Sequence, residues 1–149
     1  MRIMSVCSGN ICRSPAMEAV IRHHLPGPDH GSSGTGSWHV GEPADPRSQR
    51  VMQERGYFID HRAQQFRSSF FQEFDLILVA DRGHYQHVLA MAPDGYDKEK
   101  IRFLREWDPQ ASGDLDIPDP YYGDIEDYEL MMEIIERSVI AMSKQMKVN

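Results

Sequence analysis

Both cysteines of this chain lie in one short segment near the N-terminus. In "SVCSGNICRSP", Cys7 and Cys12 flank a Gly–Asn pair, and Arg13 follows directly. Gly9 permits backbone angles that other residues avoid, and Asn10 tolerates left-handed geometry. Such a loop between a strand and a helix can point its backbone N–H groups inward. The segment therefore predicts a site for an anion.

Three side chains of this segment indicate a particular chemistry. Cys7 begins the loop, where the positive end of a following helix favours a thiolate. Arg13 supplies a planar group that matches two oxygens of a phosphate. Ser14 can donate a hydrogen bond that helps the sulfur to leave later. Together they suit a thiolate that attacks phosphorus while amides and arginine hold the other oxygens.

The elements that must position this loop are predicted from hydrophobic pattern and capping residues. "RIMSV", residues 2–6, is typical of a short buried strand. Ser14 is a good N-cap and Pro15 suits the first helical position, in a helix that ends near Pro26. Residues 26–37, "PGPDHGSSGTGS", have the composition of a linker.

Strands and helices alternate along the rest of the chain. The predicted elements are a helix at 47–56, a strand at 74–80, a helix at 82–91 capped by Asp81, a strand at 100–104, an acidic loop at 106–123 and a long amphipathic helix at the C-terminus. This alternation indicates βαβ units and a parallel sheet, whose ligands bind at the carboxyl ends of the strands. The Cys7 loop directly follows the first strand, so it lies at that edge.

Composition limits the class of protein. The chain has 149 residues, the size of one domain, and a net charge of −7. Its pI of about 5.4 argues against nucleic acid or an anionic membrane as the main partner. The mean hydropathy is −0.55 and the N-terminus lacks a secretory pattern, so we expect a cytoplasmic location. The histidines show no spacing typical of a metal site, and we predict no metal.

The motifs, taken together, resemble one known family. "CSGNICRSP" is similar to the signature loop of the low-molecular-weight protein tyrosine phosphatases. Four further blocks resemble this family in the same order: "SSGTGSWHVGEPADPRS", "YFIDHRAQQF", "FDLILVAD" and "IPDPYYG". The resemblance implies a single α/β domain over residues 1–149, with a four-stranded parallel sheet in the order 2-1-3-4 and helices on both faces. The resemblance also implies that part of the apparent linker at 26–37 belongs to the block "SSGTGSWHVGEPADPRS" and that the second strand is short.

The resemblance implies roles for the loop and its surroundings. Cys7 would be the nucleophile and Arg13 the phosphate clamp. Asp119 would protonate the leaving oxygen and then activate water. The phosphate-binding loop would consist of Cys7, Ser8, Gly9, Asn10, Ile11, Cys12, Arg13 and Ser14. A polar network behind it would consist of Asn10, Ser14, Ser32 and His61.

The cleft is also implied by the resemblance. Trp38, Tyr121 and Tyr122 would line it, and Ile11 would form its floor. Cys12 would be a redox partner that forms a disulfide with Cys7 under oxidation. Ser8 departs from the family pattern, which usually has an apolar residue there, and its effect on substrate preference stays open.

The implied function is hydrolysis of phosphotyrosine in proteins and of other aryl phosphomonoesters, through a cysteinyl-phosphate and without a cofactor. Phosphate-like anions such as vanadate would inhibit it, and the chain would be a monomer or weak dimer. One alternative is arsenate reductase, but its relay of further cysteines has no counterpart after Cys12. Another is a non-catalytic phosphotyrosine-binding or redox-sensing module, against which Arg13 and Asp119 argue.

Overall fold

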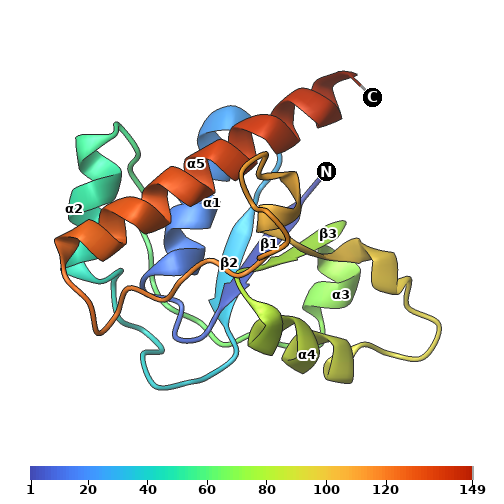
Figure 1. Cartoon of the computed structure of the whole chain (residues 1–149). Coiled ribbons are helices and arrows are strands. Elements are labelled where there is room, and N and C mark those ends of the chain that lie inside the picture. Colours follow the sequence, from blue (N-terminus) through green and yellow to red (C-terminus); the bar gives the residue numbers. More distant parts are fainter. Residues whose placement is uncertain (149) are drawn as a thin grey trace.

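A parallel sheet forms the centre of the structure, a computed structural model that describes residues 1–148 (Figure 1). Its strands, in spatial order, are β2 (Gly31–Gly34), β1 (Ile3–Cys7), β3 (Leu76–Val79) and β4 (Ile101–Phe103). The order 2-1-3-4 is thus confirmed. The register pairs Cys7 with Gly34 and Val6 with Val79, so neighbouring strands end at one edge. The loop after β1 leaves from this edge.

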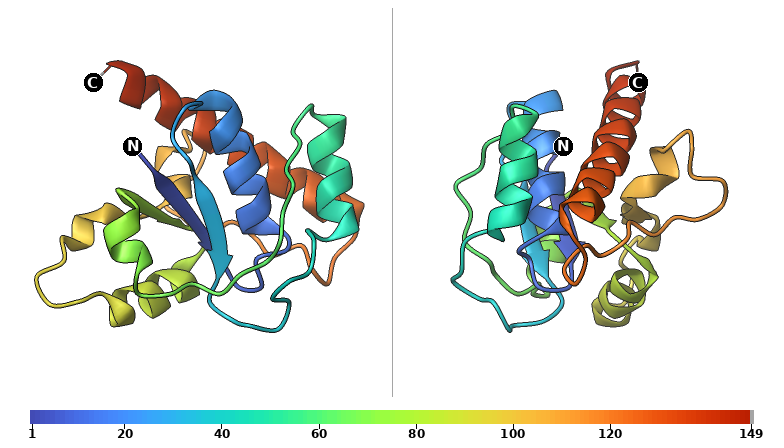
Figure 2. Two further views of the ribbon diagram at one scale, coloured as in Figure 1. Left: turned by 180° about the vertical axis from the view of Figure 1, so that it is seen from behind. Right: turned by 60° about the vertical axis from the view of Figure 1, so that its left-hand side comes forward.

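Helices cover both faces of the sheet, as expected (Figures 1 and 2). One face carries α1 (Arg13–His24), α2 (Pro46–Glu54) and α5 (Ile125–Val148); the other carries α3 (Phe70–Glu73) and α4 (Arg82–Met91). Short 3₁₀ helices, η1 (Lys98–Lys100) and η2 (Leu104–Trp107), flank β4. Side chains of β1 alternate between two apolar clusters: Ile3 packs toward α1 and α5, whereas Met4 and Val6 pack with phenylalanines around α3.

Capping fixes the helix that follows β3. The Asp81 side chain accepts a hydrogen bond from the backbone N–H of His84 at 3.1 Å. The His84 ring accepts one from the backbone N–H of Asp81 at 3.2 Å. This reciprocal pair is a capping box, so α4 begins where the sequence predicts.

Two local predictions are wrong. Helix α1 begins at Arg13 with Cys12 in the N-cap position, so Ser14 is not its cap and Pro15 is not its first residue. The hydroxyl of Ser14 faces the sulfur of Cys7 at 2.9 Å instead. The first turn consequently keeps its N–H groups available for an anion.

The composition-based linker at 26–37 contains β2. This strand has no large apolar side chain, and so the hydrophobic pattern could not reveal it. Its small residues suit a crowded position: a Cβ on Gly31 would lie 3.0 Å from Met4 and 3.2 Å from Phe74. The one-turn helix α3 was also not predicted, because four residues are too few to show a helical period.

Within residues 1–148, no helix is both long and apolar enough to cross a membrane. In the same part of the chain, no three His, Cys, Asp or Glu side chains gather as a metal site requires.

Candidate active site

The loop between β1 and α1 is held in shape from behind. Asn10 adopts a left-handed backbone angle, φ 58°, and is fully buried. Its side-chain NH₂ donates to Ser14 Oγ at 2.8 Å and to Ser32 Oγ at 3.0 Å. Its side-chain oxygen accepts from the backbone N–H of Gln64 at 2.9 Å, and its carbonyl lies 2.6 Å from His61 Nε2. The residues expected to form a supporting network therefore contact one another.

A hydroxyl group lies beside the sulfur of Cys7. Ser14 Oγ is 2.9 Å from Cys7 Sγ and 3.2 Å from the carbonyl oxygen of Ser33. Because it already accepts a hydrogen bond from Asn10, its one proton is left for the sulfur or for that carbonyl. A thiolate on Cys7 attracts this proton more strongly than a neutral carbonyl does.

Arg13 is fixed by acceptors on two neighbouring segments. It is 3% exposed. One terminal nitrogen donates to Asp81 Oδ2 at 2.8 Å and to the carbonyl oxygen of Ile117 at 2.9 Å. The other lies 3.6 Å from Asp119 Oδ2. Asp81 follows β3, so the sheet edge brings it to the arginine although the two residues are 68 positions apart in the chain.

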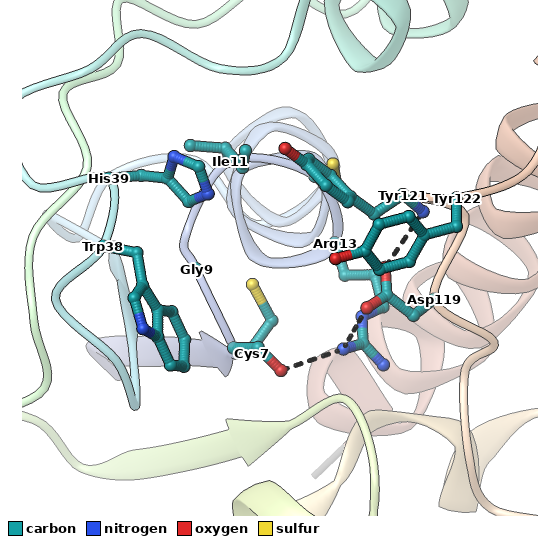
Figure 3. A pocket seen from close by; sticks show the side chains of 11 residues that line it. Cys7, Gly9, Ile11, Arg13, Trp38, His39, Asp119, Tyr121 and Tyr122 are labelled. Atoms are coloured by element: carbon teal, nitrogen blue, oxygen red, sulfur yellow. Dashed lines mark hydrogen bonds and ion pairs between the residues drawn. The ribbon is translucent and has the colours of Figure 1, made fainter.

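The predicted catalytic and cleft residues share one pocket of about 330 Å³. It is lined by Cys7, Ser8, Gly9, Ile11, Cys12, Arg13, Trp38, His39, Asp119, Tyr121 and Tyr122. Figure 3 shows Trp38 on one side and the two tyrosines on the other, with Cys7 between them. Trp38 and Tyr122 are 72% and 95% exposed, so they form the open end of this cleft.

Two histidines of the site, His39 and His84, have no predicted role in the sequence beyond the general test for a metal site. His39 lines the pocket and lies so close to the loop that a Cβ on Gly9 would be 2.9 Å from its ring. His84 contacts Ser8 and Arg13 from α4. A signal existed for His84, because it follows the predicted cap Asp81 by three residues at the carboxyl end of a strand.

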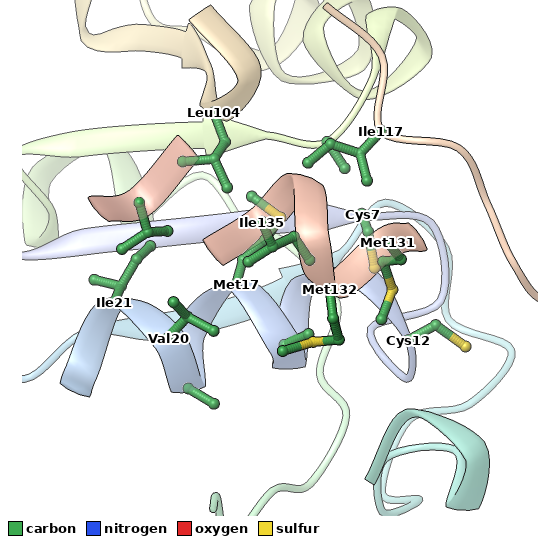
Figure 4. Close-up of a cluster of buried hydrophobic side chains, with 14 of the residues drawn as sticks. Cys7, Cys12, Met17, Val20, Ile21, Leu104, Ile117, Met131, Met132 and Ile135 are labelled. Atoms are coloured by element: carbon green, nitrogen blue, oxygen red, sulfur yellow. The ribbon is translucent and has the colours of Figure 1, made fainter. Parts of the chain in front are cut away.

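Cys12, at the N-terminal end of α1, belongs to the apolar cluster that also contains Met131 and Met132 of α5 (Figure 4). Its sulfur is 3.4 Å from the hydroxyl of Tyr128. Burial raises the pKa of the Cys12 thiol to about 12. Cys12 is therefore a thiol at neutral pH, even though it belongs to the same loop as Cys7.

This fold and site define an α/β protein with a cysteine at the end of β1 and an arginine at the start of α1, joined by a short loop. A sequence model of the family "Low molecular weight phosphotyrosine protein phosphatase" matches residues 2–149. The chain belongs to this family.

Curated relatives and solved structures agree with this assignment. A low molecular weight protein-tyrosine-phosphatase of Streptomyces coelicolor is 46% identical over 142 residues, which are 91% of this chain and 87% of the relative. A protein tyrosine phosphatase structure from Entamoeba histolytica has a TM-score of 0.91 at 34% identity and covers 99% of this chain and 97% of its own. Wzb from Vibrio vulnificus, solved in complex with benzylphosphonate, has a TM-score of 0.87 at 32% identity, with 97% of each chain covered.

Proposed function

We propose that this chain is a protein tyrosine phosphatase that hydrolyses phosphotyrosine and other aryl phosphomonoesters through a cysteinyl-phosphate. The observation that carries the proposal is the meeting of Cys7, Arg13 and Asp119 in one pocket at the start of α1. Family membership supports the class of reaction. The aromatic walls of the pocket suit a phenyl ring.

We propose one task for each group. Cys7 attacks phosphorus, while the loop amides and Arg13 hold the other oxygens as charge develops on them. Asp119 gives its proton to the leaving oxygen, then takes a proton from the water that hydrolyses the phosphoenzyme. The hydroxyl of Ser14, 2.9 Å from the sulfur, stabilises it as it leaves phosphorus in this second step.

The same proposal covers the chain's ligands and setting. Phosphate and vanadate bind at the loop and inhibit the enzyme; the benzylphosphonate complex of the Vibrio relative supports such a ligand. Residues 1–149 act as one phosphatase domain, as a monomer or weak dimer in the cytoplasm. The acidic net charge of −7 favours neither nucleic acid nor an anionic membrane as partner.

The test compares wild type with Cys7→Ser. Wild type should hydrolyse p-nitrophenyl phosphate and a phosphotyrosine peptide. The serine variant should still bind inorganic phosphate by calorimetry, which shows an intact loop, but should lose nearly all turnover. A variant that keeps a tenth of the wild-type rate would overturn the mechanism. A wild type that binds the peptide without turnover would identify a binding module instead.

A further inference from the structure

His84 is a buried side chain beside the site that the proposed mechanism does not use. It is 3% exposed. Its Nε2 atom lies 2.8 Å from Ser8 Oγ and 3.5 Å from a terminal nitrogen of Arg13. Because Ser8 lines the pocket, this contact joins α4 to the wall of the site.

The backbone assigns the position of the ring proton. The N–H of Asp81 points at Nδ1 of His84 at 3.2 Å, so Nδ1 is the acceptor and carries no hydrogen. The charged or titratable groups near the ring are Arg13, Asp81, Asp119 and His87, of which Arg13 and Asp81 contact it. Burial and the charge of Arg13 lower the pKa of His84 to about 4. The imidazole is therefore neutral above about pH 5, with its one proton on Nε2.

This tautomer decides what the hydroxyl of Ser8 can do. Nε2–H donates to Ser8 Oγ at 2.8 Å, and Arg13 donates to the same oxygen at 3.3 Å. A serine hydroxyl has two lone pairs and one proton. Both lone pairs are occupied, so the hydroxyl can act only as a donor toward a third group. Because Ser8 lines the pocket, an anion bound there would offer this donor an acceptor.

We propose, on the basis of the phosphatase function above, that the Ser8 hydroxyl donates a hydrogen bond to an oxygen of the transferring phosphoryl group, and that His84 is the positioning residue that orients it. The contact places a side-chain donor where the resembled loop usually has an apolar residue. Arg13 donates a hydrogen bond to Ser8 and would also contact the bound phosphoryl group, so the two residues would act on the same anion.

The expected effect follows from the number of donors. Loss of one preorganised donor to a developing oxyanion costs about 10²–10³ in kcat in other enzymes. Here loop amides and Arg13 share the charge, so we expect roughly a tenfold loss in kcat/KM when the Ser8 hydroxyl is removed. Binding of inorganic phosphate should weaken as well, because the phosphate dianion is an acceptor in the ground state.

The test uses two matched pairs of variants. Ser8→Thr and Ser8→Val have the same shape and differ in the hydroxyl. His84→Gln can keep both the acceptor for the Asp81 N–H and a donor for Ser8, whereas His84→Leu has neither. We expect Ser8→Val to lose roughly tenfold more kcat/KM than Ser8→Thr. We likewise expect His84→Leu to lose roughly tenfold more than His84→Gln. The double variant Ser8→Val/His84→Leu should lose less kcat/KM than the product of the two single losses, because both single variants remove the contact between Ser8 and His84.

Three results would overturn the proposal. Equal kcat/KM and phosphate affinity in Ser8→Thr and Ser8→Val would show that the hydroxyl makes no such contact. A loss of kcat/KM in Ser8→Val with unchanged phosphate affinity would place the contact on another group. A Gln variant as damaged as Leu, with both folded by circular dichroism, would leave His84 without a positioning role. Phosphate titration tests Ser8 without turnover, so its outcome is distinct from a failure of the phosphatase function.

Discussion

Asp119 and Arg13 face the same pocket but differ in exposure. The Asp119 side chain is 47% exposed, whereas that of Arg13 is 3% exposed. The hydrogen bonds of the buried Arg13 to Asp81 and Ile117 hold its orientation. A carboxyl group in contact with water can exchange its proton with solvent between the two chemical steps, which the proposed dual role of Asp119 as acid and base requires.

The loss caused by Asp119→Ala should depend on the leaving group. A phenolate leaves with difficulty because its conjugate acid has a pKa of about 10, whereas nitrophenolate leaves without help. We expect a decrease of roughly 10²–10⁴-fold for phosphotyrosine in single-turnover phosphorylation and a much smaller one for p-nitrophenyl phosphate. The matched control is Asp116→Ala, whose carboxylate accepts from the N–H of Arg82. Equal slopes of rate against leaving-group basicity in wild type and Asp119→Ala would assign the acid elsewhere.

The role of Cys12 as redox partner of Cys7 remains a prediction. The burial of the Cys12 thiol affects how fast the disulfide would form. Peroxide converts the Cys7 thiolate to a sulfenic acid, and the Cys12 sulfur then displaces water to form the disulfide. Because burial raises the pKa of Cys12 to about 12, the second step should be slow at pH 7 and faster at higher pH.

We expect a dithiol to restore activity after mild peroxide treatment of wild type. Cys12→Ser should recover much less, because its Cys7 proceeds to sulfinic acid, which a dithiol does not reduce. Mass spectrometry of the treated proteins measures both products. Equal recovery in the two proteins would leave Cys12 as a packing residue.

At the level of elements, α2 holds the segment that carries Asp119. Arg47 donates to the carbonyl oxygens of Tyr121 at 3.1 Å and Gly123 at 3.4 Å, and it pairs with Asp45 at 3.1 Å. Its guanidinium also lies 4.7 Å from the centre of the Tyr128 ring in α5. One planar side chain thus joins α2, the loop and α5.

Arg47→Lys keeps the charge but cannot maintain these contacts together. We expect roughly a tenfold lower kcat/KM for phosphotyrosine, with a smaller change for p-nitrophenyl phosphate, because the substitution displaces the proposed acid Asp119 but leaves the loop after β1 intact. Hydrogen exchange should increase at residues 119–124. The control is Arg50→Lys in the same helix, where the arginine pairs only with Glu54 among the contacts described. Equal effects of the two substitutions would exclude a role for Arg47 in holding the loop.

The elements also show what could be predicted from the sequence. The Cys7 loop was predicted because its residue types are contiguous and each has a local reason to be there. Strand β2 gave no hydrophobic signal, and only the resemblance placed it. Ser14 looked like an N-cap because capping serines and a serine that contacts a sulfur are the same residue type in a sequence. The contacts of His84 with Ser8 and Arg13 exist because β3 lies beside β1 in the sheet. A local sequence pattern does not show which strands are neighbours.

At the level of the whole molecule, the sheet brings distant residues to one edge. Ile117 donates its backbone N–H to Ala80 at 2.8 Å after β3, and its carbonyl accepts from Arg13 after β1. Three segments far apart in the sequence therefore meet at the carboxyl ends of neighbouring strands, where such sheets place their ligands. The packing of α5 against the rest of the domain contributes to the stability of this arrangement.

A buried carboxylate joins α5 to the segment after β4. Asp108 has a fully buried side chain and accepts from Arg137 at 2.6 and 3.0 Å and from Arg105 at 3.0 Å. Burial alone raises the pKa of Asp108, but the hydrogen bonds from Arg137, the Gln110 N–H and Arg105 outweigh it and lower the pKa to about 2. The unfolded value is near 3.9.

Because the folded pKa is the lower one, the charged form stabilises the fold at pH values above about 4, and this contribution is lost as pH falls toward 2. The shift corresponds to about 2–3 kcal/mol of unfolding free energy at pH 6. Asp108→Asn should therefore lower that free energy by about 2 kcal/mol or more at pH 6, since it also leaves two arginines without their acceptor. The difference from wild type should shrink between pH 4 and pH 2 as the wild-type carboxylate gains a proton. Urea unfolding across this range measures it, with Asp114→Asn as control, because Asp114 is 69% exposed and 3.8 Å from Arg105. A difference that stays constant from pH 6 to pH 2 would mean that Asp108 acts through its shape and not through its charge.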